Sequence, residues 1–302
     1  MNRKQYLTAM ISIMVIDLTL IITNFIFEYM PFIWVFVIIL AGYLFLRYKV
    51  SGSLQTFSTR FNMLVEYDLE VQKAKELVEG NLKKAPTKNM QAFYMVYLGM
   101  AKYYCGEYDE AIKTFNQIEL KKLNPAYHIL IFAFSAYASF ELEDFENFNM
   151  YLERIKTLSA NINRRYLSFV NSYIQVLEAI QGLDDNPEHY REVIESQFSQ
   201  FDGYISTKLI YNFRMAYYYR AINDEVEMDK CLAKVIANGK NHHTAIRAKE
   251  LFKNNVKVED YVFQEEAPEE FNTNDEGDQH LIANQMDNVE DIEEVESVDE
   301  EE

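Results

Sequence analysis

The sequence is poor in the residues that tight turns require. Its 302 residues include 9 Gly and 5 Pro. β-Sandwiches, β-barrels and doubly wound α/β folds need many tight turns, which these two residues provide. The scarcity argues against such folds and favours helices joined by short connections. The chain has 2 cysteines, Cys105 and Cys231, too few for a disulfide framework or a zinc site, so a reducing compartment is the simplest interpretation.

The chain has no excess of basic residues. It carries 29 Lys and Arg against 47 Asp and Glu, a net charge of −18. The acidic excess is concentrated at the C-terminus, because residues 265–302 hold 17 acidic residues and no Lys or Arg. Nothing in this distribution provides a basic face for phosphate contacts, so we expect no nucleic-acid partner.

Motifs of common enzyme chemistry are missing from the sequence. It has no glycine-rich phosphate loop, no G-x-S-x-G and no H-E-x-x-H. His242 and His243 are adjacent and would point to different sides of a helix, so they cannot chelate an ion as an i,i+4 pair would. Cys105 and Cys231 are interpreted as small buried hydrophobic residues. We therefore predict a protein that is not an enzyme and that holds no cofactor and no metal.

What the sequence does have begins with two apolar runs at the N-terminus. Residues 6–27 would form a helix of about 33 Å and residues 29–46 one of about 27 Å, long enough to cross a bilayer core. The short link between them predicts a transmembrane hairpin within residues 1–50. A signal peptide is the alternative, but the first run is too long, lacks a small-residue cleavage site and leads directly into a second run.

Charges beside the two runs predict their orientation. Arg3 and Lys4 precede the first run, and Arg47 and Lys49 follow the second, whereas the link carries Glu28 and no base. Cytoplasmic loops carry the excess of Lys and Arg. We expect a protein of the cell membrane with two spans and both termini in the cytoplasm, and the lipid bilayer is its first expected partner.

Asp17 and a few Thr, Ser and Asn residues interrupt the first apolar run. Asp17 falls near the bilayer centre, and Asn24, seven residues later, shares its helix face. Charged residues at this depth are costly and usually face another helix or a cavity. Asp17 and Asn24 are therefore candidates for an intramembrane contact with another membrane protein or another copy of the chain. The alternative is that they only pack the hairpin.

The middle of the chain, residues 51–260, has a helical pattern interrupted at regular intervals by breakers. Glu66-Tyr67-Asp68 is followed by Glu107-Tyr108-Asp109 at an offset of 41, and Asp144-Phe145 follows 37 residues later. Self-similarity at this interval is typical of a solenoid, in which stacked helix pairs bury a shared core. We predict an all-α fold with four to five such pairs, some of them degenerate.

Residues 92–118 carry the clearest motif of this region. Its small residues Gly99 and Ala111 would allow two helices to cross closely, with Tyr108 and Phe115 packed around them and a turn at Gly106. In this spacing the segment resembles the tetratricopeptide repeat (TPR) family, with the matching residues Leu98-Gly99, Ala101, Tyr103, Gly106 to Ala111 and Phe115. It departs from the family pattern at Met95, Ile118 and Pro125. The likeness covers one repeat as motif and about two thirds of the chain as architecture.

The resemblance implies a concave groove that binds a protein or peptide segment. The positions of the matching repeat that would line this groove are Phe93, Val96, Met100, Tyr103 and Tyr104. Aromatic residues at helical spacing are also typical of a core, so core packing is the alternative for each of them. The run Tyr211–Tyr219 covers every side of a helix, and we expect some of Tyr217–Tyr219 to be partly exposed.

The acidic C-terminal segment, residues 261–302, has too little apolar surface to offset the cost of ordering and is predicted to be disordered. A solvated spacer is one interpretation. A segment that binds a basic partner or the groove of its own chain is the other.

These features predict a membrane-anchored cytoplasmic scaffold that mediates protein–protein interactions. The alternatives are a structural subunit of a membrane complex recognised through its hairpin, and a membrane-tethered peptide sensor. A composition rich in Ile, Lys, Asn, Tyr and Phe is typical of an AT-rich bacterial genome.

Overall fold

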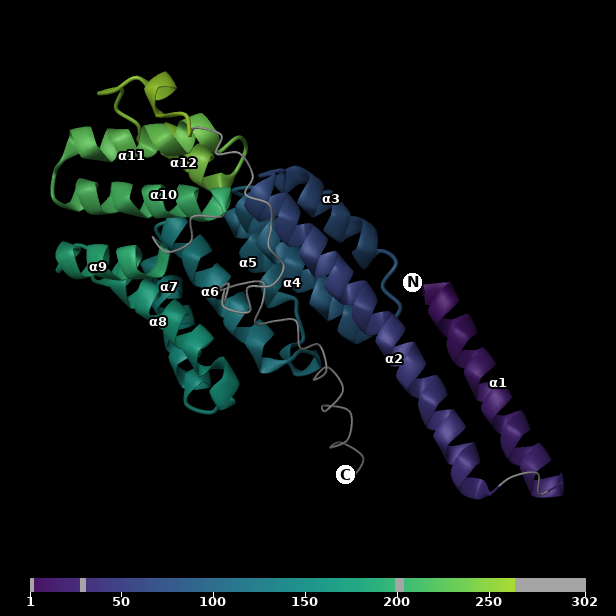
Figure 1. The fold of residues 1–302 in the computed structure, drawn as a ribbon. Helices are drawn as coiled ribbons and strands as arrows, with labels where there is room; N and C mark the ends of the chain where they lie inside the picture. Colours follow the sequence, from purple (N-terminus) through teal and green to yellow (C-terminus); the bar gives the residue numbers. More distant parts are fainter. Residues whose placement is uncertain (1–2, 28–30, 199–203, 264–302) are drawn as a thin grey trace.

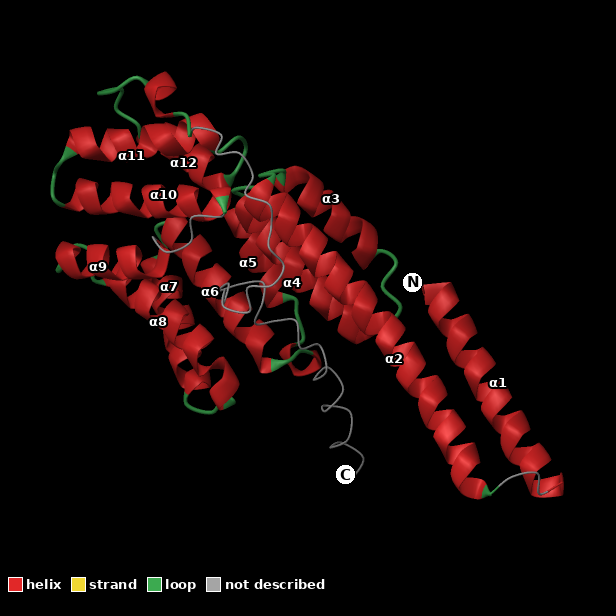
Figure 2. Ribbon diagram, in the orientation of Figure 1, coloured by secondary structure: helices red, strands yellow, loops and turns green. Residues whose placement is uncertain are grey.

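The computed structural model describes residues 3–27, 31–198 and 204–263, and within these ranges every regular element is helical (Figures 1 and 2). The predicted all-α class is therefore confirmed. The acidic segment predicted for residues 261–302 lies outside the described residues from residue 264 onward. Short linkers join the helices, in line with the small number of glycines and prolines.

Two long apolar helices form an arm that leaves the rest of the protein (Figure 1). Helix α1 (Arg3–Phe27) packs against the first part of α2 (Phe32–Asn62). Most apolar side chains of α1 are exposed, and the segment Lys4–Phe27 is long and apolar enough to cross a membrane. The apolar stretch of α2, Phe32–Phe45, is shorter. One N-terminal candidate span is thus evident, with a shorter apolar helix beside it.

Helix α2 does not end where the apolar run ends. It continues without interruption to Asn62 and then passes into a π-helical turn, Met63–Tyr67. The boundary predicted at residue 50 therefore falls inside a single helix. Leu54, Phe57 and Phe61 on its second half are buried in the core of the body, so the arm and the body share one continuous helix.

The body consists of helices that pack on their neighbours in chain order. Pairs α3·α4, α4·α5, α6·α7, α8·α9 and α10·α11 are in contact, and so are α4·α6 and α6·α8. Their bounds are α3 Val71–Leu82, α4 Lys88–Tyr104, α5 Tyr108–Asn116, α6 Pro125–Glu141, α7 Phe145–Ser159, α8 Leu167–Gln181, α9 Pro187–Phe198, α10 Ile205–Ala221, α11 Glu225–Asn238 and α12 His243–Leu251. Short 3₁₀ turns cover Leu120–Lys122, Arg164–Tyr166 and Val258–Tyr261.

A recurring turn joins the helices of several pairs. Leu69, Gly106 and Glu143 have φ values of 52°, 78° and 59°, and each is followed by an acidic residue that precedes the next helix. The same turn recurs at Asn223, whose φ is 61°. Where that acid is aspartate it caps the helix: Asp144 accepts a hydrogen bond from the backbone N–H of Asn147.

The positions of these turns show that one of the predicted repeat matches is out of register. The left-handed residues stand at 69, 106 and 143, so the structural counterpart of Glu107-Tyr108 is Glu70-Val71. The predicted match with Glu66-Tyr67-Asp68 is wrong by four residues, because Glu66 and Tyr67 lie in the π-helical turn that ends the preceding helix. The interval is 37 residues at these turns.

The C-terminal helices return to the N-terminal ones. Helix α10 contacts the π-helical turn, and α12 contacts α4. The Nζ of Lys240 donates a hydrogen bond to the backbone oxygen of Asp68 at 2.6 Å, and the rings of Tyr67 and Tyr204 lie 4.6 Å apart. Because the two ends of the body are in contact, its helices surround a common centre.

Candidate functional site

The centre of the body contains a pocket of about 90 Å³. Helices α4, α6, α8, α9, α10 and α12 all contribute to its wall, so residues from most of the body meet there. The wall consists of Tyr103, Tyr104, Phe134, Tyr137, Ser172, Tyr173, Val176, Gln197, Phe198, Ile210, Phe213, Arg214, His243 and Thr244. Aromatic side chains dominate it, and its partly exposed members are Tyr137, Ser172, Gln197, Phe198 and Ile210.

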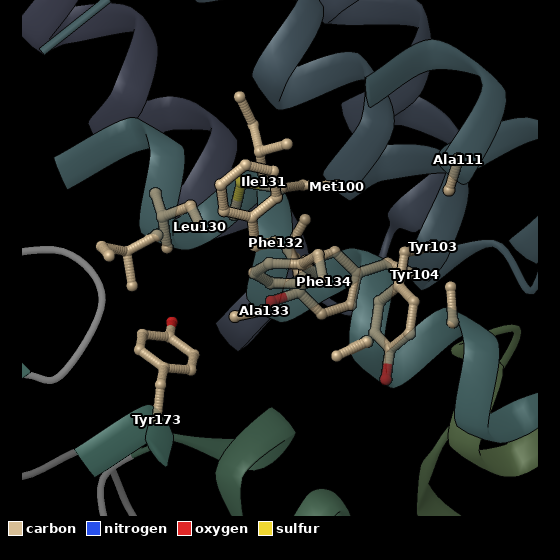
Figure 3. Close-up of a cluster of buried hydrophobic side chains, with 14 of the residues drawn as sticks. Met100, Tyr103, Tyr104, Ala111, Leu130, Ile131, Phe132, Ala133, Phe134 and Tyr173 are labelled. Atoms are coloured by element: carbon tan, nitrogen blue, oxygen red, sulfur yellow. The ribbon is translucent and has the colours of Figure 1, made fainter. Parts of the chain in front are cut away.

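Aromatic contacts hold the wall in place. The Tyr103 ring lies 5.2 Å from that of Phe134, edge to face, and 4.4 Å from the imidazole of His243. Tyr104 packs edge to face on Phe134 at 5.6 Å. Figure 3 shows Tyr103, Tyr104 and Phe134 together, with the hydroxyl of Tyr173 pointing toward this cluster. Edge-to-face pairs are favourable arrangements of aromatic rings, so these contacts stabilise the packing of the wall.

Three polar atoms in this wall are buried without a hydrogen-bond partner among the described residues. They are the hydroxyl of Tyr173, the Nε2 of His243 and the Nη1 of Arg214. The three residues are 8%, 2% and 4% exposed. A buried polar group without a partner is costly, and native structures keep few of them. Their gathering at one pocket marks it as the strongest candidate site in the body.

The hydrogen-bonding roles open to His243 follow from its neighbours. Its Nδ1 lies 3.2 Å from the hydroxyl of Tyr108. Burial lowers the pKa of His243 well below its usual range, so the imidazole is neutral, and burial raises the pKa of Tyr108, so the phenol keeps its proton. Two arrangements fit this contact: Tyr108 donates to Nδ1 and the ring proton of His243 is on Nε2, or Nδ1–H donates to Tyr108 and Nε2 is an acceptor.

Arg214 is a charged residue inside the core. Its guanidinium lies 5.3 Å from the Tyr137 ring and 5.6 Å from that of Phe140. Its nearest carboxylate is Glu141, at 3.7 Å from Nη1. That distance is too long for a hydrogen bond, so the ion pair leaves the Nη1 donor unused.

Glu141 itself is enclosed by two arginines. Its second oxygen lies 3.7 Å from Nε of Arg247 and accepts a hydrogen bond from the hydroxyl of Tyr217 at 3.2 Å. Burial raises the pKa of the Glu141 carboxyl, and the two guanidinium groups act against that rise. This buried cluster joins α6, α10 and α12 beside the pocket.

A second perturbed carboxyl lies on the π-helical turn that contacts α10. Glu66 is half-buried, and desolvation raises its pKa to about 7. It is not part of the pocket wall. Its protonation nevertheless changes near neutral pH, next to the point where the two ends of the body meet.

The predicted groove residues divide into two groups. Phe93, Val96 and Met100 lie in the core of the body and are at most 2% exposed. Tyr103 and Tyr104 line the pocket. The occupancy of a groove by a peptide stays a prediction for all five.

Sequence reasoning did not identify the polar residues of the pocket. Tyr173 belongs to no recognisable motif. His243 stands out in the sequence only as one of two adjacent histidines, which cannot chelate a metal ion as an i,i+4 pair would. Arg214 could have been noticed, because it is the only charged residue of the run Tyr211–Tyr219. The expected partial exposure within that run is confirmed, since Tyr217 and Tyr219 are partly exposed.

Asp17 and Asn24 of α1 lie in different surroundings. Asp17 is half-buried and faces a cavity of about 330 Å³ between α1 and α2, together with Met10, Ile13, Met14, Phe36, Ile39, Leu40 and Tyr43. Asn24 is 3% exposed. Asp17 thus faces the partner helix of its own arm.

The described residues contain no group of three His, Cys, Asp or Glu side chains able to hold a metal ion. Burial raises the pKa values of the Cys105 and Cys231 thiols to about 11, which disfavours the reactive thiolate.

In comparisons with known proteins, no family model, no curated protein and no solved structure matches the chain.

Proposed function

We propose that this protein is a membrane-anchored scaffold with a TPR-like helical body that binds a segment of a partner protein. The observation that supports it most is the arrangement of α4, α6, α8 and α10, which surround one aromatic pocket together with α9 and α12, while α5, α7 and α11 contribute nothing to its wall. Alternating inner and outer helices around a concave face are the architecture of TPR-like binding proteins.

The exposed apolar arm supports the anchoring part of the proposal. Side chains such as Phe25, Phe32 and Trp34 are more than half exposed. Exposed apolar surface on this scale is costly in water and favourable in lipid. Because α2 runs from the arm into the core, the anchor would hold the body at a fixed distance from the bilayer. Two spans with both termini in the cytoplasm are part of this proposal.

The topology can be tested with single cysteines in a variant lacking Cys105 and Cys231. We expect a cysteine at Ser53 or Lys113 to be labelled by a membrane-impermeant maleimide only after the membrane is permeabilised. A cysteine at Tyr29, in the link, should be labelled in intact cells. Labelling of Lys113 in intact cells would contradict a cytoplasmic body.

The binding face can be tested with a photo-cross-linking amino acid. We would place it at Gln197, at the edge of the pocket, and at Lys113, an exposed position on the outer helix α5. The proposal expects a defined adduct from position 197 in membranes and none from position 113. Equal adducts from both positions, or none from position 197, would count against a concave binding face.

A structural subunit recognised through its arm is the second candidate, and the cavity around Asp17 favours it. Replacing residues 1–46 with an unrelated two-helix anchor distinguishes the two functions. The scaffold keeps its adduct at position 197 after the exchange, whereas a subunit recognised through α1 and α2 loses its partner.

A further inference from the structure

The pocket at the centre of the body has a chemistry that a peptide groove does not require. Its wall is aromatic, and three of its polar atoms have no hydrogen-bond partner among the described residues: Nη1 of Arg214, Nε2 of His243 and the hydroxyl of Tyr173. Nη1 can only donate and the Tyr173 hydroxyl can donate or accept, whereas Nε2 donates in the tautomer in which Tyr108 donates to Nδ1. A molecule that satisfies this pocket must therefore bring acceptor oxygens and an apolar body.

We propose that this pocket binds a small aromatic carboxylate, with its ring among the aromatic side chains and its carboxylate accepting hydrogen bonds from Arg214 and Tyr173. Both residues lie against the same ring, because the Arg214 guanidinium is 5.3 Å and the Tyr173 ring 6.4 Å from the centre of Tyr137. Nε2 of His243, with its proton in the tautomer that this proposal assigns, is the third donor in the same wall.

The charge of the ligand follows from Arg214. Its Nη1 lies 3.7 Å from Oε1 of Glu141, and neither of these two atoms has a hydrogen-bond partner among the described residues. Hydrogen bonds between a guanidinium and a carboxylate are among the strongest in proteins. A neutral carbonyl would accept a weaker hydrogen bond from Nη1 than a carboxylate would, so the carboxylate is the preferred acceptor.

The size of the ligand follows from the pocket. Its volume of about 90 Å³ is too small for a folded or extended peptide segment. The pocket is smaller than the roughly 150 Å³ of an enclosed apolar cavity that takes up benzene, so a single ring would more than fill it. Because Ser172 and Gln197 bring the wall to the surface, a single ring can enter with part of the molecule still in the opening.

The test uses the full-length protein in lipid nanodiscs and four probes measured by isothermal titration calorimetry. Phenylacetate and 3-phenylpropionate are the expected ligands. Phenylacetamide keeps the ring and removes the charge, and acetate keeps the charge and removes the ring. We expect saturable binding of at least one aromatic acid, about tenfold tighter than the amide, and no saturation with acetate.

Three variants locate the binding. Tyr173→Phe removes one donor without changing the ring, and we expect it to weaken binding of the aromatic acid by about fivefold to tenfold. Ser172→Trp fills the opening from a partly exposed position and should abolish binding. Tyr151→Phe makes the same substitution on α7, at a buried residue outside the pocket wall, and should bind as the unchanged protein does. Thermal melting establishes that each variant is folded.

Several results would overturn the proposal. One is the absence of saturable binding of either aromatic acid up to about 10 mM, the range of the weakest specific complexes. Another is equal affinity for phenylacetate and phenylacetamide, which would leave Arg214 without a role. A third is unchanged affinity in both Tyr173→Phe and Ser172→Trp, which would place the ligand elsewhere. None of these results bears on cross-linking at position 197, so the scaffold function would be judged separately.

Discussion

The ring of Phe115 lies directly against Gly99, where α5 crosses α4. A Cβ atom added to Gly99 would lie 2.3 Å from Cε1 of Phe115 and 2.6 Å from two further atoms of the same ring. Phe115 is 2% exposed and cannot swing into solvent without leaving the core. The crossing of these two helices therefore depends on the absence of a side chain at Gly99.

Gly99→Ala should destabilise the protein by about 2–3 kcal/mol, because overpacking a close contact forces both helices apart. Gly80→Ala is the matched control: that glycine is also helical, but nothing lies within 4 Å of its added Cβ. There alanine should stabilise by roughly 0.5–1 kcal/mol through its higher helix propensity. Denaturant unfolding in detergent measures both. Adding Phe115→Leu to Gly99→Ala should restore part of the lost stability, because the smaller side chain makes room for the added Cβ. If the double variant is no more stable than Gly99→Ala, the predicted contact is wrong.

The close crossing of α4 and α5 could be predicted from the sequence, because the residues that produce it lie close together in the chain. Gly99, Ala111 and Phe115 stand within two neighbouring helices, and a small residue opposite a large one is evident from their spacing. The all-helical class followed in the same way, from scarce turn residues and a helical pattern. Matching residue types alone fails at Glu66-Tyr67-Asp68. Its residues are the same as those at 107–109, but the two segments have different backbone conformations.

The pocket could not be predicted, because it depends on contacts between distant parts of the chain. Tyr108 meets His243 across 135 residues, and Lys240 reaches Asp68 across 172. Such pairings arise from the curvature that many helix pairs accumulate, and no single repeat encodes it. The polar role of Tyr173 appears only when its hydroxyl is found buried without a partner.

The left-handed turns allow a test of backbone strain. Gly106 has a φ of 78° and Glu143, at the equivalent turn, has 59°. A side chain in this region costs roughly 1–2 kcal/mol. Gly106→Ala should therefore destabilise the protein by about that amount, and Glu143→Gly should stabilise it by somewhat less, since Glu143 is exposed and its ion pair with Arg247 is long, at 3.8 Å. Opposite signs in denaturant unfolding are the expected result. Equal signs would show that the two turns are not equivalent.

Glu66 should make the protein less stable as the pH rises through neutrality. Its folded pKa of about 7 lies above the ordinary value of 4.5, so the folded state retains the proton longer than the unfolded state does. Below about pH 4.5 the raised pKa therefore does not lower the free energy of unfolding. The loss grows as the pH rises to 7 and reaches about 3 kcal/mol above that. Glu66→Gln should remove this loss. Comparing unfolding near pH 5 and pH 8 measures it, and the exposed Glu146→Gln on α7 is the control, expected to keep the pH dependence of the unchanged protein.

His242 should act in the opposite direction, in acid. Its Nδ1 lies 2.8 Å from Oγ1 of Thr244 and accepts from the Thr244 backbone N–H, so it caps α12, and burial lowers its pKa from 6.5 to about 3. The unfolded state gains the proton first. The stabilising effect of a neutral His242 is therefore complete above about pH 6.5 and is lost steadily as the pH falls toward 3, by about 2 kcal/mol at pH 5. His242→Asn keeps an acceptor at the cap but cannot be protonated.

The variant should consequently lose less stability than the unchanged protein between about pH 7.5 and pH 5, even if it is less stable at both. His189→Asn, at an exposed position on α9, should leave that loss as it is in the unchanged protein. His243 is buried beside His242, with ring centres 4.6 Å apart, and its pKa is also lowered, so part of the acid sensitivity should persist in His242→Asn. An acid sensitivity identical to that of the unchanged protein would mean that His242 does not titrate with unfolding, and that α12 leaves the centre of the body before it is protonated.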